Sequence, residues 1–456
     1  MFVSGAAAIS VRMALAADSP VADREMAAVL ARIQPPKFPD HKFEIVRYGA
    51  AADGHTDSSD AIRQAIEDCS AAGGGTVVVP RGTFLTAAIH LKSHTNLRLE
   101  EGAILRFYTD PKRYPLVYSR WEGTECMNYS PLIYAFEQTD IAVTGTGMLD
   151  GQANTEIWWP WKGNARSGWK AGMPEQKSDR DSLMAMGDKN VPVSQRVFGP
   201  GHYLRPPFVQ PYRCTNVLIE GITIRNSPFW ELNPVLCRNV TVRNVKIDSH
   251  GPNNDGCDPE SCDGVLIDNC EFSTGDDCIA IKSGRNEDGR RVHTPCQNLV
   301  IRNCSMKDGH GGVSIGSEVS GDARNIFVDH CRMDSPNLDR ALRLKSNTYR
   351  GGVFENIYFT NNTVGQVSEA VVDIDFNYEE GNGGPHNPQV RNVVVENVIS
   401  AKSKYALYLR GFKNAPITGV RLANCNFKNV AQPNVIENVE GLKLEGVKRN
   451  GQPLTQ

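Results

Sequence analysis

From residue 214 onward the chain repeats one pattern, in which apolar residues alternate with polar ones, slip by one position and then resume. In the phrase that starts at Asn239, the apolar residues are Val240, Val242, Val245 and Ile247. Alternation with a period of two predicts a β-strand, and the slip at Arg243-Asn244 predicts a corner where the chain turns. Each phrase therefore predicts two short strands joined by a tight bend.

The phrase recurs at intervals that run from 23 residues (Val217 to Val240) to 36 residues (Ile357 to Val393). Its first apolar residues are Val217, Val240, Val265, Leu299, Ile326, Ile357, Val393 and Val420. No helical periodicity separates the strands, so neither a βαβ sheet nor a propeller fits, and a parallel β-helix fits best. Coils stacked about 4.8 Å apart would fuse their apolar sides into one core.

Upstream of the repeats, residues 58 to 71 have the pattern of an amphipathic helix. Its apolar face consists of Ala61, Ile62, Ala65, Ile66 and Cys69. Asp57 is expected to be the N-cap. We expect this helix to close the N-terminal end of an all-β, single-domain parallel β-helix over residues 41–456.

The repeats are interrupted over residues 154–203, which we expect to be a loop-rich insertion. This segment contains Trp158, Trp159, Trp161 and Trp169. Long ordered loops often carry function. The insertion could close one end of a cleft, because sugar rings stack on aromatic faces, or it could simply pack as a loop.

The N-terminus carries the one candidate targeting segment. Residues 1–17 are small and apolar and end with Ala14-Leu15-Ala16, which is similar to a cleavage site, although no basic residues precede the apolar run. We expect a signal peptide or its remnant there, a linker over residues 18–40, and export to the periplasm or the exterior; a frayed terminus is the alternative. No later run is long enough to span a membrane. The net charge of -3 disfavours nucleic acid and membrane surfaces as partners.

Most of the twelve cysteines fall at two recurring positions of the coils, one of which holds Ile or Val in other coils. One such set is Cys270, Cys304, Cys331 and Cys425, and a second is Cys214, Cys237, Cys262 and Cys296. We therefore expect most of them to act as small buried apolar residues. Cys257 with Cys262 remains a candidate for a local disulfide.

Four segments on successive coils align on a shared serine: Asn253 to Ser261, Gly275 to Ser283, Gly309 to Ser317 and Leu338 to Ser346. If they are one strand repeated, one inward layer is Cys257, Ile279, Val313 and Leu342, and another is Pro259, Ile281, Ile315 and Leu344. Alternate positions must then point outward. This outward set contains Asp258, Asp276, Lys282, His310, Arg343 and Lys345.

Asp255 and Asp277 fall on the inward phase of the same alignment. A charged carboxylate cannot stay unpaired in the core, so we expect an irregular strand start that turns both toward the outward strip. Repulsion among three aspartates should raise the pKa of at least one. Glycoside hydrolysis needs one protonated and one ionised carboxyl, at about 6.5–9.5 Å for inversion or about 5–5.5 Å for retention. Arg343 and Lys345 could then bind a carboxylated sugar.

On these residues the chain resembles the polygalacturonase family, glycoside hydrolase family 28, from about Phe43 to near the C-terminus. Four short signatures of that family occur in order as Asn253-Asn254-Asp255, Gly275-Asp276-Asp277, Gly309-His310-Gly311 and Arg343-Leu344-Lys345. The resemblance implies a right-handed parallel β-helix that hydrolyses α-1,4 galacturonosyl links in pectin with inversion, without metal or cofactor.

The resemblance also implies a role for each residue of the four signatures. Asp276 would be the general acid, Asp255 and Asp277 would activate water, and His310 would tune the acid. Arg343 and Lys345 would bind the carboxylate of a pectic polysaccharide or oligogalacturonide. Asn254 replaces a Thr of the family pattern, and Leu344 replaces an Ile.

Three alternatives stay open from the sequence. A rhamnogalacturonan hydrolase of the same family is disfavoured because His310 and the basic signature are both present. A β-helical pectate lyase would use calcium bridged by acidic residues, and a carbohydrate-binding protein such as an adhesin would need no chemistry at all. Exo action and oligomeric state are not fixed by the residues.

Overall fold

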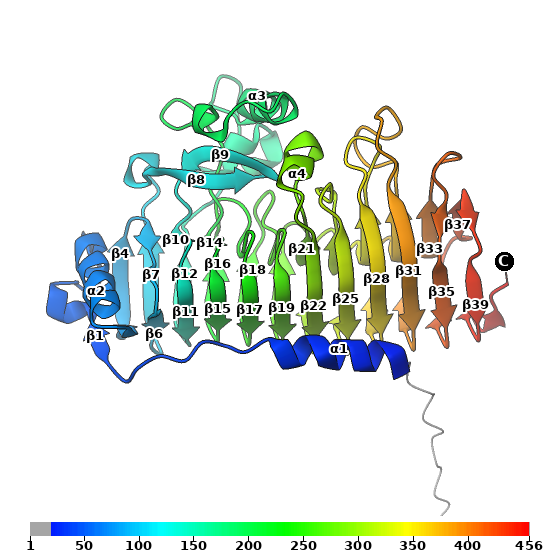
Figure 1. The fold of residues 1–456 in the computed structure, drawn as a ribbon, viewed down its shortest axis with the longest axis horizontal. Coiled ribbons are helices and arrows are strands. Elements are labelled where there is room, and N and C mark those ends of the chain that lie inside the picture. Colours follow the sequence, from blue (N-terminus) through cyan, green and yellow to red (C-terminus); the bar gives the residue numbers. More distant parts are fainter. Residues whose placement is uncertain (1–19, 456) are drawn as a thin grey trace, which may run out of the picture.

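The computed structural model describes residues 20–455, and the chain winds as a right-handed parallel β-helix (Figure 1). Three long sheets run along it. The first sheet contains β1 (Lys42–Glu44), β3 (Gly75–Val79), β6 (Thr95–Leu99), β11 (Thr139–Gly145), β15 (Thr215–Glu220), β17 (Arg238–Arg243), β19 (Asp263–Asp268), β22 (Cys296–Arg302), β25 (Ala323–Asp329), β28 (Val353–Thr360), β31 (Gln389–Glu396), β35 (Val420–Ala423) and β39 (Lys443–Glu445).

The second sheet follows the first around each coil. It contains β2 (Asp53–Asp57), β4 (Gly82–Thr86), β7 (Ala103–Phe107), β12 (Met148–Asp150), β16 (Thr223–Arg225), β18 (Lys246–Ser249), β20 (Glu271–Thr274), β23 (Ser305–Met306), β26 (Arg332–Met333), β29 (Thr363–Gln366), β32 (Ile399–Lys402), β36 (Asn426–Phe427), β40 (Lys448–Arg449) and the antiparallel β41 (Gln452–Pro453).

The third sheet consists of two pieces, and isolated β-bridges at Leu232 and Cys257 connect them. The pieces are β5 (Ile89–His90), β10 (Ile133–Phe136) and β14 (Val209–Tyr212), then β21 (Ile279–Ile281), β24 (Val313–Ile315), β27 (Arg340–Lys345), β30 (Ala370–Asp375), β33 (Tyr405–Arg410) and β37 (Val435–Glu437). A short pair, β34 (Ile417–Thr418) and β38 (Val439–Glu440), lies near the C-terminal end.

The register of the first sheet confirms the repeat predicted from the apolar pattern. The eight first apolar residues, from Val217 to Val420, pair directly with one another from coil to coil. The predicted slip is a sharp corner between the first and second sheets, where Asn244 has a φ of 56°. Asn tolerates this left-handed conformation better than most residues.

Helix α2 (Ser59–Ala71) covers the N-terminal end of the stack, as predicted (Figure 1). Its five predicted apolar residues are all buried in the main core. The predicted N-cap is shifted by one residue, because Ser58 holds the cap position and makes no side-chain cap bond. The Asp57 carboxylate instead accepts a hydrogen bond from the Ser59 backbone N–H at 2.9 Å.

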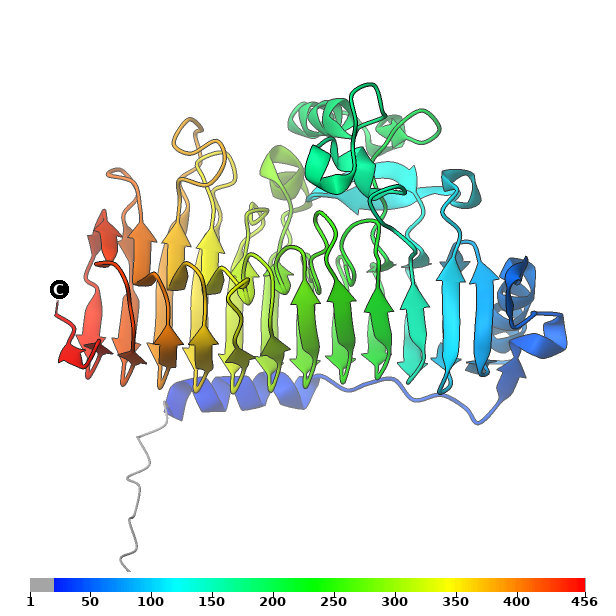
Figure 2. The ribbon, with the colours of Figure 1, turned by 180° about the vertical axis from the view of Figure 1, so that it is seen from behind.

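Helix α1 (Pro20–Arg32) lies along the outer face of the first sheet, within the stretch that the sequence assigned to a linker (Figure 2). Its apolar side packs on a strip of outward side chains from four strands of that sheet. The cluster contains Ala22, Val29 and Ile33 with Val300, Phe327, Tyr358 and Val394. The expected signal peptide over residues 1–17 lies outside the described residues.

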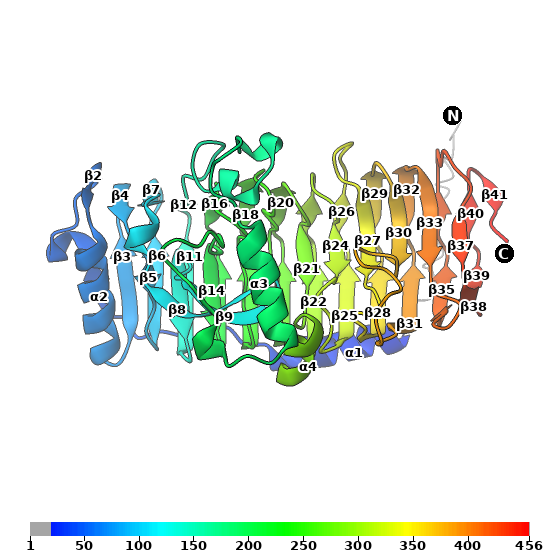
Figure 3. The ribbon, with the colours of Figure 1, turned by 90° about the horizontal axis from the view of Figure 1, so that it is seen from above.

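The insertion covers part of the side of the stack where the third sheet lies (Figure 3). It contains α3 (Lys177–Asp188) and β13 (Val197–Phe198), which pairs with an antiparallel hairpin from earlier in the chain, β8 (Leu116–Trp121) and β9 (Thr124–Tyr129). α4 (Asn286–Val292) follows β21 and packs against α3. The predicted loop-rich stretch 154–203 thus contains a full helix.

The tryptophans of the insertion differ in their surroundings. Trp158 is buried and packs edge-on against Tyr114 and Trp161, so loop packing accounts for it. Trp159 donates its indole N–H to the Ser227 carbonyl at 2.9 Å. Within residues 20–455, no helix is both long and apolar enough to cross a membrane.

All twelve cysteines lie within the described residues, and all are buried and free. The prediction that they act as small apolar residues is confirmed, and the candidate disulfide between Cys257 and Cys262 is wrong. Cys257 points into the core beside Ile279 of the third sheet. The Cys262 thiol lies before β19 and donates to the Pro234 carbonyl at 3.2 Å. The two sulfurs therefore have different neighbours and do not face each other.

Candidate active site

The predicted site residues are brought together where successive coils enter the third sheet. Asp276 and Asp277 occupy the turn between β20 and β21, and His310 lies between β23 and β24. The in-register pairing of Cys257, Ile279, Val313 and Leu342 fixes this arrangement, as the alignment predicted. Arg343 and Lys345 follow on β27, two coils beyond the aspartates.

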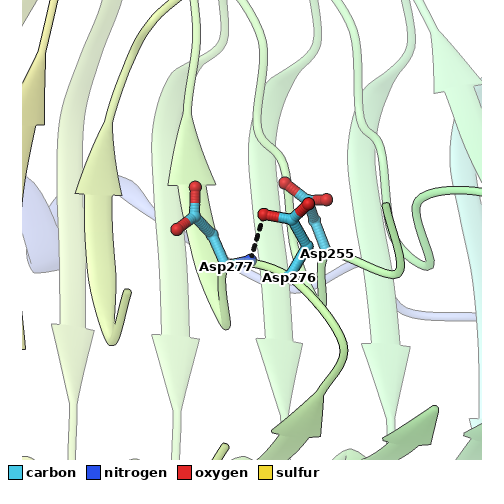
Figure 4. Close-up of side chains that lie close together, drawn as sticks. All are labelled: Asp255, Asp276 and Asp277. Atoms are coloured by element: carbon cyan, nitrogen blue, oxygen red, sulfur yellow. Dashed lines mark hydrogen bonds between the residues drawn. The ribbon is translucent and has the colours of Figure 1, made fainter. Parts of the chain in front are cut away.

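Asp255, Asp276 and Asp277 form one cluster (Figure 4). One carboxylate oxygen from each lies within 4.8 Å of the others. The prediction that Asp255 and Asp277 leave the inward phase is confirmed, because both precede the regular strand positions. The Asp277 backbone N–H donates to Asp276 Oδ1 at 3.0 Å, which fixes the turn.

Asp277 is fully buried and lies beside the two predicted substrate-binding cations. Lys345 Nζ donates to its Oδ2 at 2.7 Å, and Arg343 lies 3.6 Å from its Oδ1. Burial alone would raise the pKa of Asp277, but these two charges hold it well below its ordinary value. Asp277 is therefore the firmly ionised member of the cluster.

Asp276 is the most accessible of the three carboxylates, with 18% of its side chain exposed. Its Oδ1 lies 3.0 Å from Nδ1 of His310. Burial raises the pKa of Asp276, but the hydrogen bond and charge of His310 outweigh this effect and lower it. The same hydrogen bond raises the pKa of His310 above its ordinary 6.5. Both shifts favour a proton on His310, so below the raised pKa of His310 the pair consists of a protonated imidazole beside an ionised Asp276.

Asp255 is the carboxyl whose pKa is raised. Burial is the main cause, and the neighbouring Asp258 and Asp276 add to it, while Lys282 opposes them. The expectation that repulsion would raise at least one of the three pKa values is confirmed. The affected residue, however, is not Asp276, to which the family resemblance assigned the acid.

Two hollows meet at the Asp276–His310 pair. The first hollow, of about 490 Å³, contains Asp255, Lys282, Arg343 and Lys345. The second hollow, of about 860 Å³, lies on the other side and contains Trp159 of the insertion. The residues that line both are Lys162, Asn253, Asp276 and His310. The pair can therefore reach a bond that joins one sugar in each hollow.

Charged residues from α3, from the β8–β9 turn and from the segment after β30 line part of the first hollow. Arg180 of α3 lies 2.7 Å from Glu122 in the β8–β9 turn and 3.7 Å from Glu379. All three line the hollow. We refer to Glu122, Arg180 and Glu379 as the end wall.

Sequence reasoning missed several residues of the first hollow. Tyr378 lies under Arg343 and Lys345, whose charges are 5.5 and 5.3 Å from its ring centre. Trp230 faces the same hollow, and the Lys282 ammonium lies 4.6 Å from its ring. Lys282 was recognised as outward-facing, but no role was assigned to it. Trp230 and Tyr378 precede or follow regular strands, so their direction could not be inferred from alternation.

Clustered carboxylates can also hold a divalent cation. Here the oxygens of Asp277 already face the ammonium of Lys345 and the guanidinium of Arg343. Two fixed cations at this distance would repel a third. The donor set therefore fits a metal poorly, and it fits a proton-transfer site well.

A parallel β-helix with clustered carboxyl groups and fixed cations in a cleft defines a glycoside hydrolase for an acidic sugar chain. Residues 198–447 match the family described as Glycosyl hydrolases family 28, and residues 43–98 match a profile described as rhamnogalacturonase A/epimerase, pectate lyase-like. The chain belongs to glycoside hydrolase family 28, the polygalacturonase family.

Individual relatives agree with this assignment. The structure of a hyperthermoactive exopolygalacturonase from Thermotoga maritima is 44% identical, with a TM-score of 0.93 over 95% of this chain and 97% of that one. A family 28 exopolygalacturonase from Yersinia enterocolitica shares the fold at 22% identity and a TM-score of 0.72, over 91% of this chain and 79% of that one. A Vitis vinifera sequence described as "Probable polygalacturonase" is 27% identical over 88% of this chain and 78% of its own length.

Proposed function

We propose that this protein is an exo-acting polygalacturonase, which hydrolyses α-1,4 galacturonosyl links of pectin from a chain end. Membership of the family and the 44% identity to an exopolygalacturonase support the activity. The observation that carries the proposal is the position of Asp276 and His310 between the hollow that the end wall borders and a wider one. A chain end fits against the end wall, and the rest of the polymer leaves through the second hollow.

In the proposed reaction, Asp276 donates a proton to the oxygen of the leaving sugar. The proton shared with His310 at 3.0 Å is the source. Asp255 and Asp277 position the attacking water, and Asp255 must be ionised to take its proton. When substrate fills the first hollow it displaces water around Asp276, and this favours the protonated form of that acid.

The proposed substrate carries a carboxylate on every sugar. The first hollow offers Arg343, Lys345 and Lys162 to such groups. Burial of these cations strengthens their attraction to an anion because solvent screens them little. A neutral sugar at the cleaved position would leave the charges unmatched, so homogalacturonan is favoured over a rhamnogalacturonan backbone.

Product analysis on polygalacturonate and rhamnogalacturonan, side by side, tests the substrate. We expect small galacturonate products from the first and little release from the second. Viscosity measured together with reducing ends tests the mode of attack. Exo action releases many reducing ends while viscosity stays high, and a steep viscosity fall at low conversion would contradict it. An unsaturated product, or loss of turnover with chelator, would instead indicate a lyase.

Inversion is part of the proposal and rests on the family. The oxygens of the three aspartates lie closer together than the usual range of about 6.5–9.5 Å for inverting pairs, so spacing alone assigns no outcome. Proton NMR of the first-formed product gives the anomer directly. A β-anomer from the α-link supports inversion, and an α-anomer contradicts it.

We also propose that the protein is exported, because residues 1–17 resemble a signal peptide. N-terminal sequencing of secreted protein tests this proposal. We expect a mature chain that starts near residue 18, and retention of the intact N-terminus in the cytosol would contradict export.

A further inference from the structure

Lys282 follows β21 and lies at the bottom of the first hollow with 4% of its side chain exposed. Its Nζ is surrounded by three carboxylates, at 3.3 Å from Glu318, 3.7 Å from Asp258 and 4.0 Å from Asp255. A buried ammonium is costly unless several opposite charges meet it, and here three do. The position of the Lys282 charge is therefore tightly constrained.

The other cations of the site pair with the other two aspartates of the cluster. Arg343 and Lys345 face Asp277, and His310 faces Asp276. Among the described residues, Lys282 is the ion-pair partner of Asp255. Oδ2 of Asp255 faces Lys282, while its buried Oδ1 has no hydrogen-bond partner among the described protein atoms. Asp255 also lines the first hollow, so its carboxylate lies next to the space that substrate and water enter.

Asp258 and Glu318 fix the lysine in place. Asp258 is fully buried one strand position from the core layer, and neither of its oxygens has a hydrogen-bond partner among the described residues. It does not line either hollow, so its chemistry is directed at Lys282 rather than at substrate. Glu318 approaches from the next coil, after β24, and also lies 3.6 Å from Arg285.

We propose that Lys282 is a positioning residue for hydrolysis, which favours the ionised form of Asp255 and orients its carboxylate for the attacking water, with Asp258 and Glu318 holding the lysine in register. The inference rests on the proposed polygalacturonase activity. It assigns Lys282 no contact with the reacting atoms, so the lysine acts through Asp255.

The direction of the electrostatic effect follows from the surroundings of Asp255. Burial, Asp258 and Asp276 raise the pKa of Asp255, and Lys282 is the largest opposing charge. The charged groups that face this pair from the packed elements are Arg205, Asp258, Glu260, Asp276, Asp277, Glu318, Arg343 and Lys345. Without Lys282, Asp255 would become ionised only at a higher pH.

The test is the pH profile of kcat/KM on polygalacturonate for Lys282→Met, which keeps the length of the side chain and removes its charge. We expect the acidic limb to move to higher pH, with a loss of about tenfold on that limb for each pH unit of displacement. The alkaline limb should move less. Lys282→Arg keeps a charge and should stay close to wild type. Lys246→Met, an exposed lysine on β18, is the matched control.

Lys282→Met leaves Asp258 without its ion-pair partner and Glu318 with Arg285 alone, so the fold is checked by the melting temperature. If the single variant does not fold, Lys282→Met with Glu318→Gln removes the closest pair of opposite charges, keeps Asp258 beside Asp255 and gives the readout. Both variants should show the displaced acidic limb. An unmoved limb in a folded variant, with wild type active, overturns only this inference. No wild-type turnover on any pectic backbone overturns the proposed function and the inference together.

Discussion

Nδ1 of His310 lies 3.0 Å from Oδ1 of Asp276, and this contact joins two successive coils at the boundary between the two hollows. The two residues are 34 positions apart in the sequence. The stack therefore brings an acid and its proton partner together with no local motif. The hydrogen bond makes the protonation of the two side chains interdependent.

Replacement of the acid tests its role directly. Asp276→Asn keeps the shape of the side chain and removes its acidic proton. We expect kcat to fall by about 10²–10⁴-fold, the usual contribution of a general acid. Reducing-end release gives the rate, and an unchanged circular dichroism spectrum shows that the fold is intact. A variant that kept wild-type turnover would remove Asp276 from the mechanism.

His310 should set the alkaline limit of activity. Its pKa is raised above 6.5 by Asp276, so the shared proton is present below that raised pKa and is lost as pH rises through it. In His310→Asn the proton must be held by a carboxyl alone, which releases it at lower pH. We expect the alkaline limb of kcat/KM to move to lower pH. The exposed His41→Asn should leave the limb in place, and an unmoved limb in His310→Asn would argue against proton sharing.

Lys345 should matter for stability as well as for binding. Lys345→Met leaves Asp277 ionised and buried without its closest partner, and loss of one member of a buried pair costs about 3–5 kcal/mol. The folded pKa of Asp277 lies below its ordinary 3.8, so this stabilisation is present above pH 3.8 and is lost as pH falls through the folded pKa. Melting curves of both proteins should therefore differ most near neutral pH and converge in acid. Equal melting temperatures at neutral pH would contradict the pairing.

The end wall should decide where the substrate is cut. Arg180→Ala removes one of the two arginines that join Glu122 to Glu379, the other being Arg285, and widens the first hollow at the end wall. We expect viscosity to fall faster for each reducing end released, because chains can then pass through. Lys189→Ala, at the exposed end of the same helix, is the control. An unchanged ratio would show that other residues close the cleft.

Helix α1 should stabilise the stack without contributing to chemistry. Ile33, which directly follows α1, is buried against the outer apolar strip of the first sheet, far in sequence from the site residues. Ile33→Ala should lower the free energy of unfolding by about 2–5 kcal/mol, as for other buried large-to-small changes. The melting temperature should fall while kcat/KM stays at its wild-type value. A variant that lost activity but not stability would show that α1 acts on the cleft.

The sequence predicted the stack and its site well because both depend on a repeated local pattern. Alternation placed His310 and Arg343 outward, and the cost of a buried charge placed Asp255 and Asp277 with them. The apolar spacing of Ala22, Met26, Val29 and Ile33 was also helical, but no repeat drew attention to it. The sequence therefore predicted a linker where the structure has helix α1.

The features that could not be predicted depend on distances across coils. Repulsion predicted one raised pKa, but the identity of Asp255 follows from its burial and from where Lys282 and Lys345 lie. The end wall joins three segments that lie far apart in the chain. Cys257 and Cys262 are close in sequence, yet the turn between two sheets gives each sulfur different neighbours.

The buried thiols have a practical consequence for making the protein. All twelve cysteines, each within the described residues, are free and packed in the interior. Folding therefore needs no oxidant and no disulfide isomerase, and the finished molecule should tolerate a reducing solution as well as an aerated one. Expression in an ordinary bacterial cytosol, without an oxidative folding pathway, should yield the native stack.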